Sequence, residues 1–250
     1  MKVVGFLAVL ITGSLLLYAA ADLPDWGDPH SRPNSYLSPH YIRHALSDTA
    51  VPNIVTAVLA DYRSYDTLFE TAVVFTAGIA ILTILGSLKG NERTGKAIGT
   101  IVLEADLIVT TACRLIVPPL QLFGLYVVAH GHHSPGGGFQ GGVILGASLI
   151  LLSLSYDLRT AQQRLTAKAG ITLAAIGVLL YAGIGSVCMV LGSNFLDYGG
   201  LAKLLPGTDS IMARSHGILG VEIGVAITVM SSIYLIYANL SSRGGMEEGL

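Results

Sequence analysis

Long apolar stretches separated by polar segments run along the whole chain. A membrane-spanning helix needs about 20 mostly apolar residues. Six such stretches occur, at approximately 3–21, 69–88, 106–130, 138–156, 169–191 and 215–238. The pattern predicts an all-α membrane protein with about six transmembrane helices. The first stretch resembles a signal peptide, because a lysine and an apolar run precede the small residues 19–21. We interpret it as a helix that the chain retains.

The long polar segment 22–68 changes character near its middle. Residues 22–40 are rich in Pro, Asp and Ser and are expected to be irregular. Further on, apolar residues follow helical spacing; they are Val51, Ile54, Val55, Val58 and Leu59. We therefore expect a short amphipathic helix at the membrane interface, starting near Asp48.

The composition supports a membrane protein. Of the 250 residues, 52% are hydrophobic and 12% are charged, whereas a soluble domain carries about 25% charged residues. The net charge of −2 gives no indication of a nucleic-acid partner. No catalytic set of nucleophile and base, phosphate loop or cofactor motif is visible. We expect neither a cofactor nor an enzymatic activity of the chain itself, although it could be a non-catalytic subunit of an oxidoreductase complex.

Basic residues predict the orientation in the cell membrane. With a cytoplasmic N-terminus, eight Lys and Arg residues of the polar segments fall on the cytoplasmic side and five on the outer side. This bias predicts that both termini are cytoplasmic. A charged segment then divides the chain into a two-helix unit (1–90), a cytoplasmic linker (91–105), a four-helix unit (106–240) and a polar tail (241–250).

The segment HGHHSPGGGFQGG, residues 130–142, joins the third and fourth apolar stretches. Pro135 cannot continue a helix, and Gly136, Gly137 and Gly138 permit unusual backbone angles before Phe139. One interpretation is a tight hairpin whose glycines serve packing. The other is a broken helix start that lines a hydrated cavity, with histidines at its mouth.

The histidines at 130, 132 and 133 also raise the question of a metal. Closely spaced histidines can bind Zn²⁺, but no Cys or carboxylate lies near them in the sequence. We predict no metal site and expect histidines at the membrane interface.

Two charged residues fall inside predicted spans. At about 1.5 Å per residue, Arg114 lies roughly 12 Å into its span and Glu222 roughly 10 Å into its own from the opposite face. In a core of about 30 Å their Cα levels then differ by roughly 8 Å. Their side chains could form a structural ion pair, each could pair with another subunit, or Glu222 could relay protons or cations. His216 begins the same span as Glu222 but points to a different face.

Asp66 and Glu70 form a second acidic site. They are four residues apart and share one helical face. Asp66 could begin the helix as a cap, with Glu70 in the first turn. Alternatively, Glu70 faces a route for cations or protons.

The pattern G-H-x-S-P-G-G-G-F-Q-G-G resembles the MnhB/MrpB subunit family of Mrp-type multisubunit Na⁺/H⁺ antiporters, over roughly residues 100–240. The run TAVPNIVTAVLADYRSYDTLFE, residues 49–70, resembles the C-terminal part of MrpA-type subunits and a small subunit of membrane-bound hydrogenases. These resemblances imply a fusion of two neighbouring subunits. They also favour a transport role for Glu70.

The resemblance implies a small membrane subunit of an ion-translocating module, which contributes to a cation or proton path and to assembly. Its partners would be large antiporter-like and small membrane subunits, Na⁺, H⁺ and the lipid bilayer. Two alternatives stay open: the same module within a hydrogenase-like respiratory complex that couples redox chemistry to ion pumping, and a stand-alone transporter. The candidate path residues are Glu70, Asp66, Glu222, Arg114, His130 and His216.

Overall fold

Helices make up most of the described chain, which comprises residues 2–91, 107–156 and 158–242 of a computed structural model. No strand occurs among these residues. The chain divides into two units, residues 1–44 and 45–250. Six helices, one in the first unit and five in the second, are long and apolar enough to cross a membrane. The predicted fold class is confirmed.

The first unit contains α1 (Lys2–Ala20), a π-helical turn η1 (Pro33–Leu37) and the beginning of α2 (Ser38–Thr49). The side chains of α1 are almost all exposed, as expected of a helix that presents its surface to lipid. The expectation of irregular structure across 22–40 is wrong for its last part. Pro33 and Pro39 sit in first turns, where a missing N–H is tolerated.

The second unit contains the other candidate spans, which are α4 (Ser64–Asn91), α5 (Leu107–Ala129), α6 (Gly138–Ser155), α8 (Ala167–Val190) and α9 (Ser210–Ser242). α4 and α9 each begin five residues before the predicted span. α9 begins at Ser210 because Asp209 accepts a hydrogen bond from the Met212 N–H at 2.7 Å. With 33 residues, α9 is about 50 Å long and exceeds a hydrocarbon core of about 30 Å.

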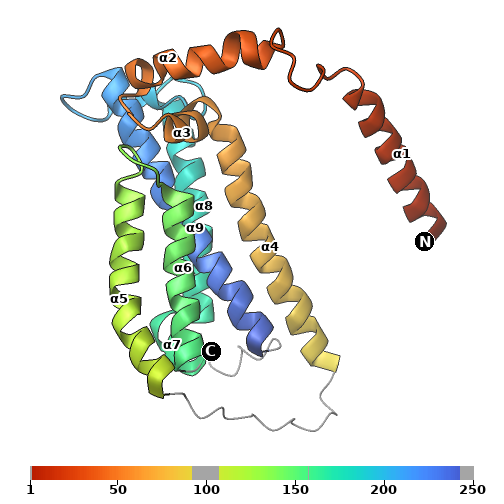
Figure 1. Cartoon of the computed structure of the whole chain (residues 1–250), viewed down its shortest axis with the longest axis vertical. Helices are drawn as coiled ribbons and strands as arrows, with labels where there is room; N and C mark the ends of the chain where they lie inside the picture. The colour runs from red at the N-terminus through yellow and green to blue at the C-terminus, as the bar shows by residue number, and fades with distance from the viewer. Residues whose placement is uncertain (1, 92–106, 157, 243–250) are drawn as a thin grey trace. The chain divides into compact units, whose positions relative to one another are not determined.

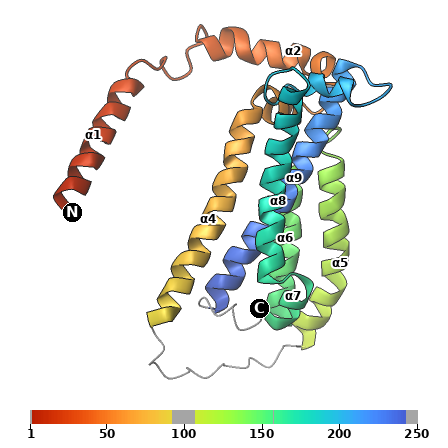
Figure 2. The ribbon, with the colours of Figure 1, turned by 180° about the vertical axis from the view of Figure 1, so that it is seen from behind.

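α9 is the central helix of this unit. It packs against α4, α6 and α8, while α5 packs mainly against α6 (Figures 1 and 2). Small residues allow the close approach. A Cβ on Gly142 of α6 would lie 2.8 Å from the Ala226 oxygen of α9, and one on Gly177 of α8 would overlap the Gly224 oxygen. Glycine therefore holds these helices closer together than side chains would allow.

Short helices and loops gather at one end of this unit. They are α3 (Ile54–Ala57), the π-helical turn η2 (Val58–Tyr62), the loop 130–137 and the 3₁₀ turn η3 (Tyr198–Lys203), whereas α7 (Leu158–Arg164) lies at the opposite end (Figure 1). The helix expected to start near Asp48 starts instead after Asn53. Ala50, with φ of 55°, and Pro52 separate α2 from α3. Val51 is fully buried.

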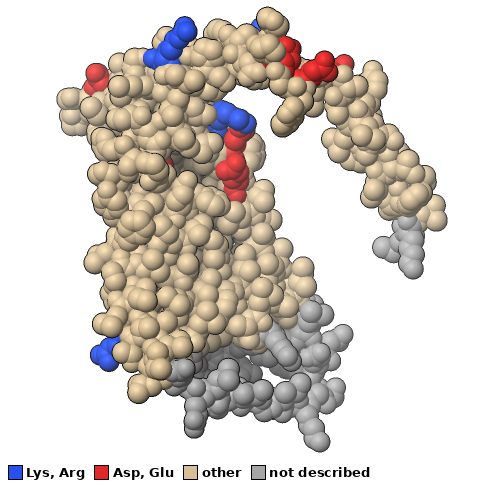
Figure 3. Space-filling model, viewed as in Figure 1, with Lys and Arg blue, Asp and Glu red and all other residues tan. Residues whose placement is uncertain are grey.

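On the face in Figure 3, the middle of the second unit carries few charged side chains. At the start of α4, Arg63 and Asp66 form an exposed ion pair. A surface with few charges suits the hydrocarbon core of a bilayer, where a charged side chain is costly.

The predicted boundary at residue 90 does not coincide with the two units. α4 packs against α8 and α9, so residues 45–91 belong to the same unit as the later helices. The predicted linker beyond Asn91 and the predicted tail beyond Ser242 lie outside the described residues.

Candidate functional site

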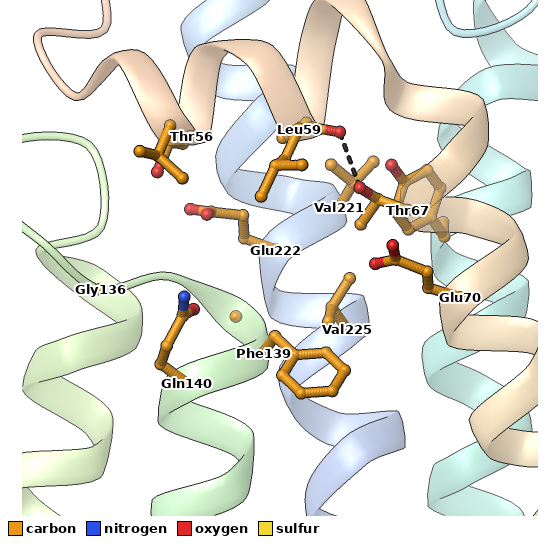
Figure 4. A pocket seen from close by; sticks show the side chains of 14 residues that line it. Thr56, Leu59, Thr67, Glu70, Gly136, Phe139, Gln140, Val221, Glu222 and Val225 are labelled. Atoms are coloured by element: carbon orange, nitrogen blue, oxygen red, sulfur yellow. Dashed lines mark hydrogen bonds between the residues drawn. The ribbon is translucent and has the colours of Figure 1, made fainter. Parts of the chain in front are cut away.

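Two carboxylates line one cavity of about 230 Å³ in the second unit. Glu70 comes from α4 and Glu222 from α9, and Figure 4 shows them on opposite sides of the cavity. Glu70 is exposed in the isolated chain, whereas Glu222 is buried. The rest of the lining is mixed; it includes Thr56, Leu59, Thr67, Gly136, Phe139, Gln140, Tyr181, Val221 and Val225. The cavity is therefore lined by two carboxylates together with apolar and uncharged polar side chains.

Glycines make room for the Glu222 carboxylate. A Cβ on Gly137 would lie 2.7 Å from Glu222 Oε1, and one on Gly131 would lie 3.2 Å from Oε2. Gly137 has φ of 125°, which disfavours any other residue. The backbone N–H of Gly138 interacts favourably with the carboxylate. The absence of side chains at these glycines thus leaves space for the Glu222 carboxylate against the loop backbone.

His132 is the nearest ionisable neighbour of Glu222. Its Nδ1 lies 3.7 Å from Glu222 Oε2, and both side chains are about nine-tenths buried. His132 Nε2 lies 2.9 Å from the Ser215 carbonyl oxygen. Burial lowers the pKa of His132, the positive charges of His133 and His216 add to this effect, and the Ser215 carbonyl opposes it. His132 is therefore biased toward the neutral imidazole.

Asn53 holds the glycine-rich loop in place. Its Nδ2 donates to the carbonyl oxygens of Gly131 and Ser134, each at 2.8 Å, and its backbone N–H donates to His132 O at 2.9 Å. Its Oδ1 accepts from the Val55 N–H and caps α3. One residue before α3 thereby positions a loop about 80 residues later in the chain.

A second buried carboxylate, Asp61 of η2, has a different environment. Arg214 Nη2 donates to Asp61 Oδ2 at 2.6 Å, and Arg214 Nε donates to Oδ1 at 3.2 Å. Burial raises the pKa of Asp61, and the charge and hydrogen bonds of Arg214 act in the opposite direction. This ion pair connects η2 to the first turns of α9.

A hydroxyl cluster lies beside the cavity. The Ser64 hydroxyl is 2.6 Å from Tyr198 Oη and 3.0 Å from Tyr181 Oη, and Tyr181 Oη also donates to Ser64 O at 2.9 Å. Burial raises the pKa of Tyr198. The cluster joins the start of α4 to α8 and η3, and Tyr181 brings it to the cavity wall.

The structure separates the predicted path residues. Arg114 is exposed on α5 and forms no ion pair with Glu222 within the described chain. Matching depths were not sufficient, because α6 packs between α5 and α9. Asp66 is not the cap of α4, which begins at Ser64; its carboxylate pairs with Arg63 on the surface.

His130 and His216 also lie outside the cavity. His130 stacks on Tyr126, with 4.7 Å between ring centroids. His216 lines a separate, apolar groove between α8, α9 and η3. Of the predicted motif, Gly136, Gly138 and Phe139 line the cavity, Gly137 adjoins the Glu222 carboxylate, and Pro135 is exposed. Within the described residues, no cluster of three His, Cys, Asp or Glu side chains could hold a metal.

Sequence reasoning missed His132, Asn53 and the pair of Asp61 with Arg214. His132 was visible only as one member of a histidine cluster. Asn53 carried a clearer signal, because an Asn directly before an apolar helical pattern is a typical N-cap. Nothing in the local sequence indicates that Asp61 pairs with a residue 153 positions later.

Two family models match this chain, one over its N-terminal part and one over its C-terminal part. Residues 108–235 match the family model described as "Domain related to MnhB subunit of Na+/H+ antiporter". That match covers about half of the chain. The chain belongs to this family. The resemblance expected from the PGGGF segment is confirmed.

A relative of this MnhB-related chain is the B-type subunit of the Na⁺/H⁺ antiporter of Bacillus subtilis (strain 168). It is 35% identical over 133 residues, which are 51% of this chain and 92% of that protein. Residues 30–96 match a second family model, MbhE, which describes one of the subunits of MBH. The residues between the two family matches, 97–107, overlap the predicted linker.

Two solved structures resemble nearly all of the MnhB-related chain. One comes from the membrane-bound sulfane sulfur reductase (MBS), an archaeal respiratory membrane complex, with a TM-score of 0.59, 25% identity and coverage of 94% of this chain and 97% of that one. The other comes from the Mrp complex of Dietzia sp. DQ12-45-1b, with a TM-score of 0.57, 25% identity and coverage of 94% and 26%. The relatives are thus subunits of membrane complexes.

Proposed function

We propose that this multi-pass membrane protein is a small subunit of a multisubunit Na⁺/H⁺-translocating module, in which the cavity between Glu70 and Glu222 forms part of a cation or proton path. The observation that carries the proposal is the meeting of two carboxylates from different spans in one cavity. An ionisable group inside a membrane is costly and usually serves a route for ions or protons.

Assembly with other membrane subunits is the second part of the proposal. Glu70 and Phe139 line the cavity yet are exposed in the isolated chain. Lipid covers a carboxylate poorly, so a neighbouring subunit is the suitable cover for this side. Chemistry, where the complex performs any, belongs to other chains.

A respiratory complex is the second candidate setting. The MBS chain supports it, because the likeness covers 97% of that chain and 94% of this one. In that setting the subunit would couple redox chemistry in other chains to ion movement. The two settings place the same cavity in the same role and differ only in the partner chains that co-purify. A stand-alone transporter would instead move ions as the purified chain alone in liposomes.

The orientation and the domain history are also proposals. Both termini are placed in the cytoplasm, which puts the loop 130–137 and the cavity near the outer end of the spans. Residues 1–90 and 106–240 represent two ancestral subunits fused into one chain. The two family matches, over 30–96 and 108–235, support this division.

The test uses everted membrane vesicles that contain the whole complex. Na⁺-dependent proton release is followed with a ΔpH-sensitive dye. Glu222→Gln is expected to abolish the response and Glu70→Gln to reduce it, while the complex still assembles. The matched control is Asp209→Asn on α9, which lies outside the cavity and retains a good helix cap. Normal transport in both glutamate variants would refute the proposed path.

A further inference from the structure

The hydrogen bond of His132 to Ser215 fixes the tautomer of the neutral ring. A carbonyl oxygen can only accept, so Nε2, at 2.9 Å from Ser215 O, must carry a proton and donate it. In the neutral imidazole the other nitrogen, Nδ1, is then unprotonated and has a free lone pair. Nδ1 is the atom that faces Glu222.

Glu222 Oε2 is the matching half of this arrangement. It is buried and has no hydrogen-bond partner among the described residues. It lies 3.7 Å from His132 Nδ1, which is about 0.5 to 1 Å longer than the usual donor–acceptor distance of a direct hydrogen bond. A small side-chain movement or one bridging water closes this gap. An acid oxygen without a hydrogen-bond partner therefore faces an unprotonated ring nitrogen, and one proton could be shared between them.

We infer that Glu222 and His132 together form a proton-binding pair that holds one exchangeable proton between Oε2 and Nδ1. This inference rests on the proposed function and names the ion that occupies this side of the cavity. In the transfer, the Oε2–H bond breaks and an Nδ1–H bond forms. The products are a carboxylate and an imidazolium, so the net charge of the pair does not change.

The surroundings of Glu222 suit a proton better than an alkali cation. Na⁺ needs several oxygen ligands. The groups around this carboxylate include the ring nitrogen of His132, the N–H of Gly138 and Gln140 Oε1, which lies 3.3 Å from the same Gly137 Cβ position that Glu222 Oε1 approaches to 2.7 Å. Of these three groups, Gln140 alone offers an oxygen ligand. An N–H directed at the site repels a cation and stabilises a carboxylate. The Thr56 hydroxyl is already used, since it donates to Gly131 O at 2.8 Å.

The other charged groups around His132 are few. His133 comes from the same loop, and His216 and Glu222 come from α9. From α3 and its cap, Thr56 and Asn53 contact the loop, and neither side chain ionises in the physiological range. When charged, the two neighbouring histidines disfavour the imidazolium form of His132. Among the described residues, Glu222 is the acidic group that lies within 4 Å of Nδ1 and can exchange a proton with it.

The test is ¹⁵N NMR of the histidine-labelled complex in lipid across a pH series. A pair that shares a proton titrates in two coupled macroscopic steps, and His132 Nδ1 is expected to report both. His132→Gln assigns the signal by its disappearance. In Glu222→Gln only one step is expected to remain, while the matched control His133→Gln retains both steps. Nε2 is expected to stay protonated throughout.

Three results would overturn the inference. One is an identical single step of Nδ1 in the wild type and in Glu222→Gln. Another is a neutral ring protonated on Nδ1. The third is a step that moves when Na⁺ replaces choline at constant ionic strength, because it would show that a cation competes for the carboxylate. The transport assay stays separate. Two coupled steps in the wild type, together with normal transport in both Glu70→Gln and Glu222→Gln, would refute the proposed path. Lost transport in Glu222→Gln, together with a single step in the wild type, would refute the proton pair.

Discussion

Two buried carboxylates lie near the same end of the second unit, and their surroundings differ. The Asp61 side chain is 2% exposed and receives two hydrogen bonds from Arg214, one to each oxygen. The Glu222 side chain is 9% exposed, and its Oε2 has no hydrogen-bond partner among the described residues. Its neighbours include the His132 imidazole, glycine backbone and the Gln140 side chain. The two carboxylates are buried to a similar extent. Arg214 neutralises the charge of Asp61, whereas Glu222 has an oxygen available to bind a proton.

The difference separates structural from functional acidity. A buried ion pair with good geometry is costly to break but has no reason to release a proton. A buried carboxylate without a permanent counter-charge can exist with or without its proton, which a relay requires. The contrast can be tested by removing each region in turn and comparing the loss of stability with the loss of transport.

The largest effect is expected from Gly138→Ala, because the added methyl group disrupts the contact between α6 and the Glu222 backbone on α9. A Cβ at Gly138 would overlap the Glu222 backbone oxygen, so α6 and α9 cannot keep their spacing. We expect a loss of about 4 kcal/mol or more in the free energy of unfolding, measured by circular dichroism of the full chain in mixed micelles. Gly183→Ala on α8 is the control, because no atom lies within 4 Å of its Cβ position. Equal stability of the two variants would contradict the close contact.

The next effect is expected from Asp61→Asn, which breaks the structural pair. It leaves the Arg214 guanidinium without its counter-charge. Because the Arg214 side chain is 32% exposed and water can reach it, we expect a loss of about 2 to 3 kcal/mol, at or below the lower end for a fully buried pair. The double variant Asp61→Asn with Arg214→Gln should recover part of this loss, because no uncompensated charge remains. The same unfolding measurement checks both. If the double variant were as unstable as the sum of the single variants, the two residues would not be energetically coupled.

Asn53→Ala should cost about 2 kcal/mol. It removes a helix cap, worth about 1 kcal/mol, and leaves the Gly131 and Ser134 carbonyls with fewer donors. The loop that carries His132 should then exchange its amide hydrogens faster, which hydrogen-exchange mass spectrometry of residues 130–137 can detect. Asn53→Asp restores the cap but not the two donated bonds. Unchanged exchange in both variants would remove Asn53 from its positioning role.

The sequence predicted much of the fold for a simple physical reason. In lipid, every backbone polar group must be satisfied within the segment, so a span appears as one long apolar run. α5, α6 and α8 therefore begin and end within about two residues of the predictions. The ends of α4 and α9 were less predictable, because polar first turns outside the membrane have no apolar signature. The contacts of Asn53 with the glycine-rich loop were unpredictable for another reason, because the partner residues are about 80 positions away in the sequence.

The sequence indicated two parts of the candidate site, its acids and the glycine-rich segment, of which Gly136, Gly138 and Phe139 line the cavity. Glu70 and Glu222 were identified because a charge inside a span is rare and costly. The pairing of Glu222 with Arg114 was wrong, because sequence gives the depth of a residue but not which neighbour its helix face meets. His132 could be separated from His130 and His133 only after the turn at Gly137 placed one ring against α9.

A smaller effect is expected from pH through His132. Burial lowers the folded pKa of His132, so below the unfolded value of about 6.5 the unfolded chain binds more protons than the folded chain. Stability should therefore fall as the pH decreases through and below this value. His132→Gln retains a donor for the Ser215 carbonyl and should remove this part of the pH dependence. An unchanged slope in that variant would assign it to other groups.

The smallest effect on stability is expected from Glu222→Gln, which changes the free energy of unfolding by less than about 1 kcal/mol. Oε2 has no hydrogen bond to lose, the amide has almost the same volume, and its N–H can donate to His132 Nδ1. A neutral side chain also avoids the cost of burying a charge. The same variant is expected to abolish transport in the intact complex, the reverse of Asp61→Asn, whose main effect is on stability. A loss of stability as large as that of Asp61→Asn would mean that Glu222, too, is held as a structural charge, and the distinction between the two carboxylates would fail.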